Sequence, residues 1–160
     1  MLYNYQKKYL KYKEKYLNLS KNINQNGGVH KKKSINNTND QEILVYIEIS
    51  KNSHIKYEFD HELNALICDR VLPTPFYFPF NYGFIPNTLS GDGDPLDALV
   101  MLDEPTFPGC VVSARAVAML RMTDEKGGDD KLLCVAAGDI RKAGIKDIGD
   151  LPVYELDEIK

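Results

Sequence analysis

The sequence has no long hydrophobic run, and this shortage excludes whole classes of protein. Its 160 residues contain no apolar run longer than the six residues 132–137, far below the roughly 20 that a membrane-spanning helix needs. A signal peptide is also missing, because lysines interrupt the only N-terminal candidate region, at Lys7, Lys8, Lys11, Lys13 and Lys15. We therefore expect no membrane segment and no secretion signal in what amounts to one domain with a tail.

Cysteines are few as well. Cys68, Cys110 and Cys134 are odd in number, widely spaced and form no C-x-x-C pair. These features argue against a disulfide scaffold and a zinc knuckle. The apolar neighbours of the cysteines favour buried packing for each thiol. We expect a reducing, intracellular compartment, namely the cytoplasm.

Charge divides the chain into two parts. Residues 1–40 hold nine lysines and two acids, for a net +7, whereas residues 41–160 hold 11 basic and 21 acidic residues, for a net −10. An acidic body repels phosphate at long range. If this body handles phosphates, we expect it to do so through divalent cations.

The basic leader, residues 1–40, precedes the predicted domain, residues 41–160. Its first part has a helical stripe, with Tyr5, Tyr9, Tyr12, Tyr16 and Leu19 at steps of four and three. Residues 18–40 are rich in Asn, Lys, Ser and Gly, which predicts a flexible linker. A solvated helix is favoured here over a nucleic-acid or membrane-surface patch. The leader also resembles Tyr/Lys leaders of large DNA virus proteins, which implies a viral or host-cytoplasm setting.

Five strands are predicted in the body, with period-two alternation in residues 43–47 and 55–59, and the fold class is mainly β. The first three strands are expected to form an antiparallel meander, and short helical signals occur near 97–102, at 139–143 and at the end of the chain. Five mostly antiparallel strands with few short helices predict an OB-like β-barrel. The predicted strands cover residues 43–47, 55–59, 65–71, 111–122 and 131–136.

A dense acidic motif, D-G-D-P-L-D, begins at Asp92 and includes Asp94 and Asp97. Three carboxylates this close repel one another, so their ionised forms need a compensating cation. All-oxygen ligands point to Mg²⁺, with Mn²⁺ as a substitute, and the spacing does not match a calcium helix-loop-helix site. A solvated acidic turn is the alternative interpretation.

A second acidic segment, residues 123–131, contains Asp124, Asp129 and Asp130. Alone it would be an ordinary charged hairpin. Paired with the first motif, it could ligate two or more Mg²⁺ ions, an arrangement that stabilises attacking and leaving oxygens in phosphoryl displacement.

Three cations lie at or near predicted strand ends, close to acidic residues: Lys56, Arg70 and Lys131. Each alone is an ordinary surface ion pair, but together they could hold a highly charged phosphate. Tyr82 would add a neutral hydroxyl donor, or pack its ring with Phe80 and Phe84.

Together these motifs resemble the soluble Mg²⁺-dependent inorganic pyrophosphatases of the β-barrel type (family I). The resemblance runs in order from about Val45 to Pro152. It is carried by the segments I-K-Y-E-F-D at 55–60, D-R at 69–70, N-Y-G-F-I-P-N-T-L at 81–89, D-G-D-P-L-D at 92–97, and M-T-D-E at 122–125 with Asp129 and Lys131.

The resemblance implies an inorganic diphosphatase that hydrolyses pyrophosphate to two phosphates, and a homo-oligomer. It implies Asp94 as general base on the attacking water, with Glu48 as an outer acid near the metals. The implied ligands of several Mg²⁺ ions are Asp92, Asp97, Asp124 and Asp129, and the implied phosphate-binding groups are Lys56, Arg70, Tyr82 and Lys131.

Two departures from the family pattern bear on activity. Phe78 stands where the family has a tyrosine, and the chain stops before the long helix with its phosphate-binding Tyr-Lys pair. We expect a C-terminally truncated homologue with reduced activity. The alternatives are a catalytically impaired fragment that binds Mg²⁺ or pyrophosphate, and a single-strand nucleic-acid-binding OB module in which aromatic residues 76–80 stack bases. The net −10 charge of residues 41–160 opposes binding of a nucleic acid, so we expect no clear nucleic-acid partner.

Overall fold

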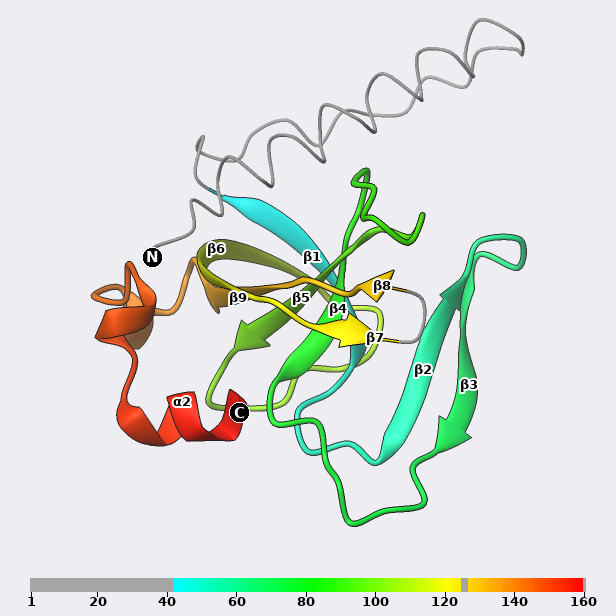
Figure 1. Ribbon diagram of the computed structural model, residues 1–160, viewed down its shortest axis with the longest axis horizontal. Helices are drawn as coiled ribbons and strands as arrows, with labels where there is room; N and C mark the ends of the chain where they lie inside the picture. Colours follow the sequence, from blue (N-terminus) through cyan, green and yellow to red (C-terminus); the bar gives the residue numbers. More distant parts are fainter. Residues whose placement is uncertain (1–41, 125–126, 160) are drawn as a thin grey trace, which may run out of the picture.

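A closed five-stranded barrel with a two-stranded hairpin beside it makes up most of the described chain (Figure 1). The computed structural model describes residues 42–124 and 127–159, and the side chain of Asp124 lies outside that description. The predictions for the leader, residues 1–40, fall outside the described residues.

The barrel strands follow the order β1-β4-β5-β9-β6, which confirms the predicted five-stranded barrel. All neighbours are antiparallel except β5 and β9, which run parallel. The barrel strands are β1 (Ile43–Ile49), β4 (Asn81–Ile85), β5 (Leu96–Met101), β6 (Val111–Leu120) and β9 (Lys131–Ala136). The remaining elements are β2 (Ile55–Asp60), β3 (Ala65–Val71), β7 (Thr123–Asp124), β8 (Gly127–Gly128), the short 3-10 helices η1 (Ile140–Lys142) and η2 (Ile148–Asp150), and α2 (Val153–Ile159).

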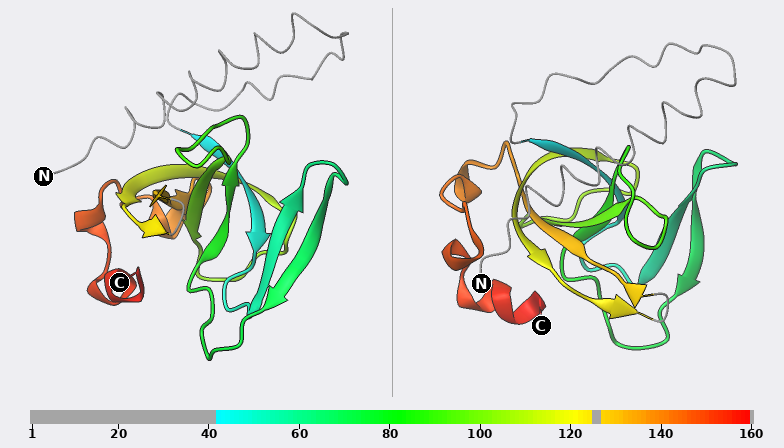
Figure 2. Two further views of the ribbon diagram at one scale, coloured as in Figure 1. Left: turned by 45° about the vertical axis from the view of Figure 1, so that its right-hand side comes forward. Right: turned by 45° about the horizontal axis from the view of Figure 1, so that its top comes forward.

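The membership of the barrel differs from the prediction. The expected meander of residues 43–71 is wrong, because both edges of β1 are taken by β4 and β6. Strands β2 and β3 form a separate two-stranded sheet on one side of the barrel, opposite the C-terminal segment (Figure 2). Two barrel strands, β4 and β5, were not predicted as strands, and the helical signal near 97–102 was wrong.

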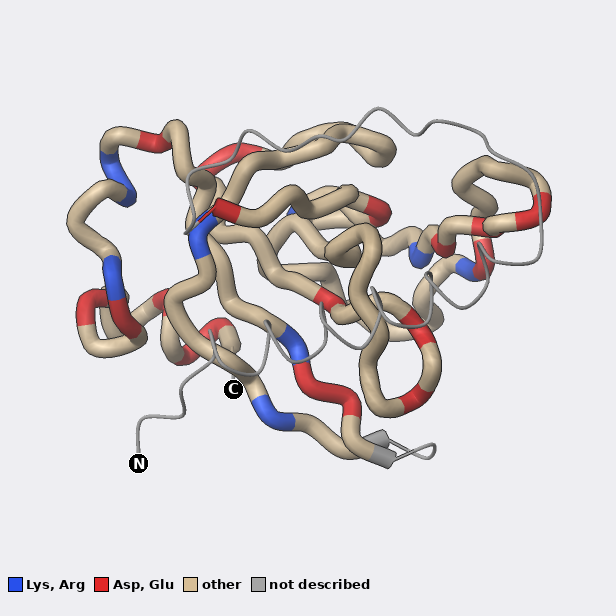
Figure 3. Tube along the Cα trace, turned by 90° about the horizontal axis from the view of Figure 1, so that it is seen from above, with Lys and Arg blue, Asp and Glu red and all other residues tan. Residues whose placement is uncertain are grey.

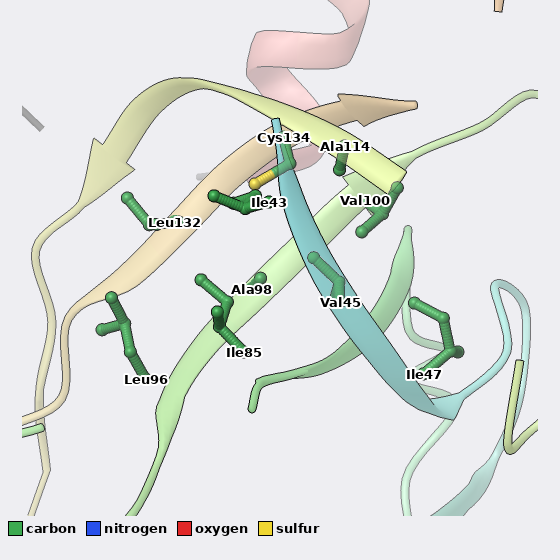
Figure 4. Close-up of a cluster of buried hydrophobic side chains, with 10 residues drawn as sticks. All are labelled: Ile43, Val45, Ile47, Ile85, Leu96, Ala98, Val100, Ala114, Leu132 and Cys134. Atoms are coloured by element: carbon green, nitrogen blue, oxygen red, sulfur yellow. The ribbon is translucent and has the colours of Figure 1, made fainter. Parts of the chain in front are cut away.

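Burial on both faces explains why β5 and β9 lack a clear period of two. Ala98, Val100, Leu132 and Cys134 point into the barrel core (Figure 4), whereas Leu99 and Leu133 belong to a second apolar cluster. The second cluster includes Ile145 and Leu151, with Leu156 and Ile159 of α2 packed against it. A strand with two covered faces is a continuous apolar run, which periodicity cannot distinguish from a buried helix.

The other local predictions have mixed outcomes. A 3-10 helix at 140–142 and helix α2 confirm two of the helical signals. Cys134 is buried, as predicted, but Cys68 is exposed on β3, so packing does not account for that thiol. No helix within the described residues is long and apolar enough to cross a membrane.

Candidate active site

Strand register brings Asp97 and Lys131 together. They are direct partners near the start of the parallel strands β5 and β9, and the Lys131 Nζ lies 2.8 Å from Asp97 Oδ2. The same ammonium lies 2.9 Å from Asp129 Oδ1. Two carboxylates from separate segments therefore converge on one cation.

Tyr82 completes this group from the neighbouring strand β4. Its hydroxyl donates to Asp97 Oδ2 at 2.5 Å and accepts from Lys131 Nζ at 3.3 Å. The ring of Tyr82 lies 5.6 Å from that of Phe78, with the Lys131 ammonium 5.2 Å from its centroid. The Tyr82 hydroxyl thus donates to Asp97 and its ring contacts Phe78, whereas donation to a substrate phosphate stays a prediction. We call Tyr82, Asp97, Asp129 and Lys131 the central cluster.

Partial burial governs the electrostatics of the central cluster. The side chain of Lys131 is 12% exposed. Burial acts to lower the pKa of Lys131, but the charges and hydrogen bonds of Asp97 and Asp129 outweigh it and raise that pKa. For Tyr82, burial raises the pKa and the charge of Asp97 raises it further. The phenol therefore stays protonated and can donate a hydrogen bond.

Glu48 lies on β1 near the central cluster. Its side chain is buried and accepts a hydrogen bond from the Phe59 backbone N–H at 2.8 Å. Burial raises the pKa of Glu48 to about 7, with smaller contributions from the charges of Asp97 and Glu58. Glu48 is therefore a carboxyl poised to change protonation near neutral pH, as an acid-base group requires.

The predicted phosphate-binding cations Lys56 and Arg70 face each other on the hairpin. They are register partners of β2 and β3. Lys56 Nζ contacts Glu58 Oε1 at 2.6 Å and Asp69 Oδ2 at 3.7 Å, and Arg70 contacts Asp69 Oδ2 at 2.6 Å. The sequence reasoning gave no role to Glu58 or Asp69. Their positions in the sequence could have indicated a role, because Glu58 lies two residues after Lys56 and Asp69 directly precedes Arg70.

The acidic loop before β5 holds Asp92 and Asp94 on the surface. Asp92 Oδ1 accepts from the Asp94 backbone N–H at 3.1 Å, and Ser90 N–H donates to the Asp94 carbonyl at 2.7 Å. Gly93 sits between them at φ +98°, a conformation that favours glycine. The loop is thereby turned so that both carboxylates are exposed to solvent, and these hydrogen bonds stay within the loop itself.

These donors fit a divalent metal in part. Asp97 and Asp129 already direct oxygens at one positive charge, and all the candidate ligands are oxygens, as Mg²⁺ prefers. Within residues 42–124 and 127–159, however, no three acidic, histidine or cysteine side chains lie close enough together to cage an ion. Asp92 is not gathered with Asp97 and Asp129, and the side chain of Asp124 is outside the described set.

The sequence model of the family described as inorganic pyrophosphatase matches residues 45–160. The chain belongs to this family. Among inorganic pyrophosphatases, the Synechocystis protein is 53% identical over 117 residues, which cover 73% of this chain and 69% of the relative. The Streptomyces coelicolor enzyme is 55% identical over 119 residues, covering 74% and 73%.

Solved pyrophosphatase structures share the fold. The Thermus thermophilus pyrophosphatase superposes with a TM-score of 0.74 at 46% identity, covering 78% of this chain and 72% of its own. The Helicobacter pylori pyrophosphatase gives 0.73 at 47% identity, covering 81% and 77%. The barrel with its adjoining hairpin is therefore the inorganic pyrophosphatase fold.

Proposed function

We propose that this chain hydrolyses inorganic pyrophosphate to two phosphates in a Mg²⁺-dependent reaction, with Mn²⁺ as a substitute. The observation that carries the proposal is the central cluster, in which carboxylates from β5 and the segment before β9 converge on one cation. Membership of the pyrophosphatase family supports pyrophosphate as the substrate.

Asp97 and Asp129 would hold Mg²⁺ together with Asp92, and Asp124 would hold a further ion. When bound, Mg²⁺ lowers the pKa of water and neutralises phosphate charge. For Asp92 to join the other two, its loop must close toward β5. Asp92 is exposed on this loop, which turns at Gly93.

The protein's own groups do the rest of the work. Asp94 would accept the proton of the attacking water while the water oxygen bonds to one phosphorus and the bridging P–O bond breaks. Lys56, Arg70, Lys131 and the Tyr82 hydroxyl would bind the phosphate oxygens and orient them for in-line attack. Glu48 would act as an outer acid beside the metals; its pKa of about 7 belongs to the metal-free protein, and the charge of bound Mg²⁺ would lower it.

Phosphate release from Mg²⁺-pyrophosphate tests the proposal. Asp97→Asn should lower kcat by about 100-fold or more, because an amide neither carries the charge of a metal ligand nor pairs fully with Lys131. Asp60→Asn is the matched control, since Asp60 is an acid of the hairpin turn whose cap an asparagine can keep. Its rate should stay within about twofold of the parent.

Equal phosphate release by the parent and Asp97→Asn would overturn the catalytic assignment. Calorimetric titration with Mg²⁺ would then distinguish the impaired alternative, in which the parent binds the ion without turnover.

All three cysteines are free thiols, which supports a reducing, cytoplasmic location. A homo-oligomer is also proposed, and light scattering of the purified chain checks it.

A further inference from the structure

The hairpin contains one irregularity, and it lies at the candidate phosphate-binding cations. Lys56 pairs with Arg70, whereas the next residue of β2, Tyr57, pairs with Cys68. Asp69 is therefore an extra residue in β3, a β-bulge. Bulges often redirect a side chain at a functional site.

This bulge places an acid and a base opposite the same lysine. In regular pairing, neighbouring residues of a strand point to opposite faces, so only one of Asp69 and Arg70 could share a face with Lys56. The extra residue removes that restriction. Asp69 Oδ2 lies 2.6 Å from the Arg70 guanidinium and 3.7 Å from the Lys56 ammonium. Acidic and basic positions accordingly lie side by side on the hairpin, right in Figure 3.

We propose that Asp69 is a positioning residue that holds Lys56 and Arg70 at a fixed spacing for the phosphate groups of the substrate. The proposal rests on the proposed function, in which both cations bind pyrophosphate. Asp69 does not itself touch the substrate, because a carboxylate would repel phosphate.

Preorganisation is the physical benefit. Lysine and arginine are flexible side chains, and immobilising each one on binding carries an entropic cost. Asp69 restricts Arg70 through the contact at 2.6 Å before the substrate arrives, and it shares the restriction of Lys56 with Glu58, the nearer partner of that lysine at 2.6 Å. Its side chain is 30% exposed, so each ion pair is solvent-screened and its effect on affinity is modest.

The sign of the effect separates this role from simple electrostatics. Removing a negative charge near a bound anion should tighten binding if only long-range charge matters. If Asp69 positions the cations, its removal should weaken binding instead. The two explanations therefore predict opposite changes in KM.

The test measures kcat and KM for Mg²⁺-pyrophosphate in Asp69→Ala, Asp69→Asn and the control Glu62→Ala. Glu62 is an exposed acid of the same hairpin turn, so its loss reports the effect of charge alone. We expect Asp69→Ala to raise KM by roughly 2- to 5-fold with kcat within about twofold. Asp69→Asn keeps an acceptor oxygen and should be intermediate, whereas Glu62→Ala should leave KM unchanged or lower it.

Calorimetric binding of Mg²⁺-imidodiphosphate, a non-hydrolysable diphosphate, makes the result independent of turnover. A loss of affinity in Asp69→Ala but not in Glu62→Ala supports the proposal even in a parent that does not turn over, which would overturn only the proposed hydrolysis. Unchanged or tighter binding overturns the positioning role. Equal loss of binding affinity in Asp69→Ala and Glu62→Ala also overturns the positioning role. A fall in kcat at constant KM, together with a lower thermal unfolding midpoint, overturns it as well, because reduced stability of the hairpin would then be the cause. A parent that neither hydrolyses pyrophosphate nor binds the analogue overturns both proposals.

Discussion

Tyr82 donates its hydrogen bond to the same Asp97 oxygen that contacts Lys131. Asp97 Oδ2 is thus stabilised by one neutral and one charged donor from the adjacent strands β4 and β9. A carboxylate oxygen with two fixed donors keeps its orientation, which a metal ligand or acid-base group requires. The barrel register sets this orientation, because all three residues come from neighbouring strands.

Tyr82→Phe should distinguish the contribution of the Tyr82 hydroxyl to activity from that of its ring. Phenylalanine keeps the packing against Phe78 but removes the donor to Asp97. A hydrogen bond to a charged group contributes about 1.5 kcal/mol or more, so kcat/KM for Mg²⁺-pyrophosphate should fall by about 10-fold. Steady-state phosphate release measures this change.

Tyr77→Phe is the matched control for that substitution. Tyr77 is half exposed and stacks its ring on His54, with centroids 3.6 Å apart, so the same loss of a hydroxyl should leave kcat/KM within about twofold. If both variants lost activity equally, the Tyr82 hydroxyl would have no special role.

Glu48 should make the metal-free protein less stable as the pH rises. Its pKa is about 7 in the folded state against 4.5 ordinarily, so between these values the folded state binds more protons than the unfolded state. The free energy of unfolding therefore falls as the pH rises through this window, by about 3 kcal/mol for this one group. Urea unfolding in EDTA at pH 4.5, 6 and 8 measures the trend.

Glu48→Gln should remove this contribution. Glutamine can still accept from the Phe59 N–H but does not titrate. The variant should therefore be more stable than the parent at pH 8 and similar at pH 4.5. A parent and variant with parallel stability curves would show that Glu48 keeps an ordinary pKa in the folded protein.

The sequence predicted the chemistry better than the strand partners. The D-G-D-P-L-D motif and Lys131 indicated the correct neighbourhood, and Asp97 and Lys131 do meet. Sequence periodicity shows which residues of a strand share a face, but it does not show which strand lies beside which. The meander of residues 43–71 failed for this reason.

Other features depend on tertiary contacts that no local pattern encodes. β5 was missed because both of its faces are covered, which removes the alternation of Ala98 and Leu99 from the hydropathy pattern. The bulge at Asp69 depends on a one-residue register shift between β2 and β3. Periodicity read along a single strand does not reveal such a shift.

Gly83→Ala should disrupt the pairing of β1 and β4. A Cβ at Gly83 would lie 1.9 Å from the Tyr46 carbonyl oxygen and 2.8 Å from the Ile47 Cα, both of which are backbone atoms. Backbone in a closed barrel cannot shift cheaply, so the free energy of unfolding should fall by about 3 kcal/mol or more. Gly138→Ala is the control, because a Cβ added there would meet no described atom within 4 Å apart from those of Gly138 and its two neighbours in the chain. Thermal unfolding measures both variants. Equal stability of Gly83→Ala and Gly138→Ala would show that β1 and β4 can move apart at Gly83 at little cost.

The ion pair of Lys142 and Glu155 should be the most sensitive polar contact of the C-terminal segment. Both side chains are under 10% exposed, and Lys142 Nζ lies 2.5 Å from Glu155 Oε1, while Glu155 Oε2 has no hydrogen-bond partner among the described residues. Glu155→Gln would leave the buried Lys142 ammonium with Asp103, a part-exposed carboxylate 3.4 Å away, as its remaining ion-pair partner. The substitution should therefore cost about 2 kcal/mol in urea unfolding.

The double substitution Lys142→Met with Glu155→Leu distinguishes burial cost from a need for the pair itself. Apolar residues of similar size remove both desolvation costs, so the double variant should recover most of the stability that Glu155→Gln loses. Glu158→Gln, at an exposed position of the same helix, should change the free energy of unfolding by less than about 0.5 kcal/mol. A double variant less stable than Glu155→Gln would instead show that the ion pair, together with the Lys142 contact to Asp103, fixes how the C-terminal segment docks on the barrel.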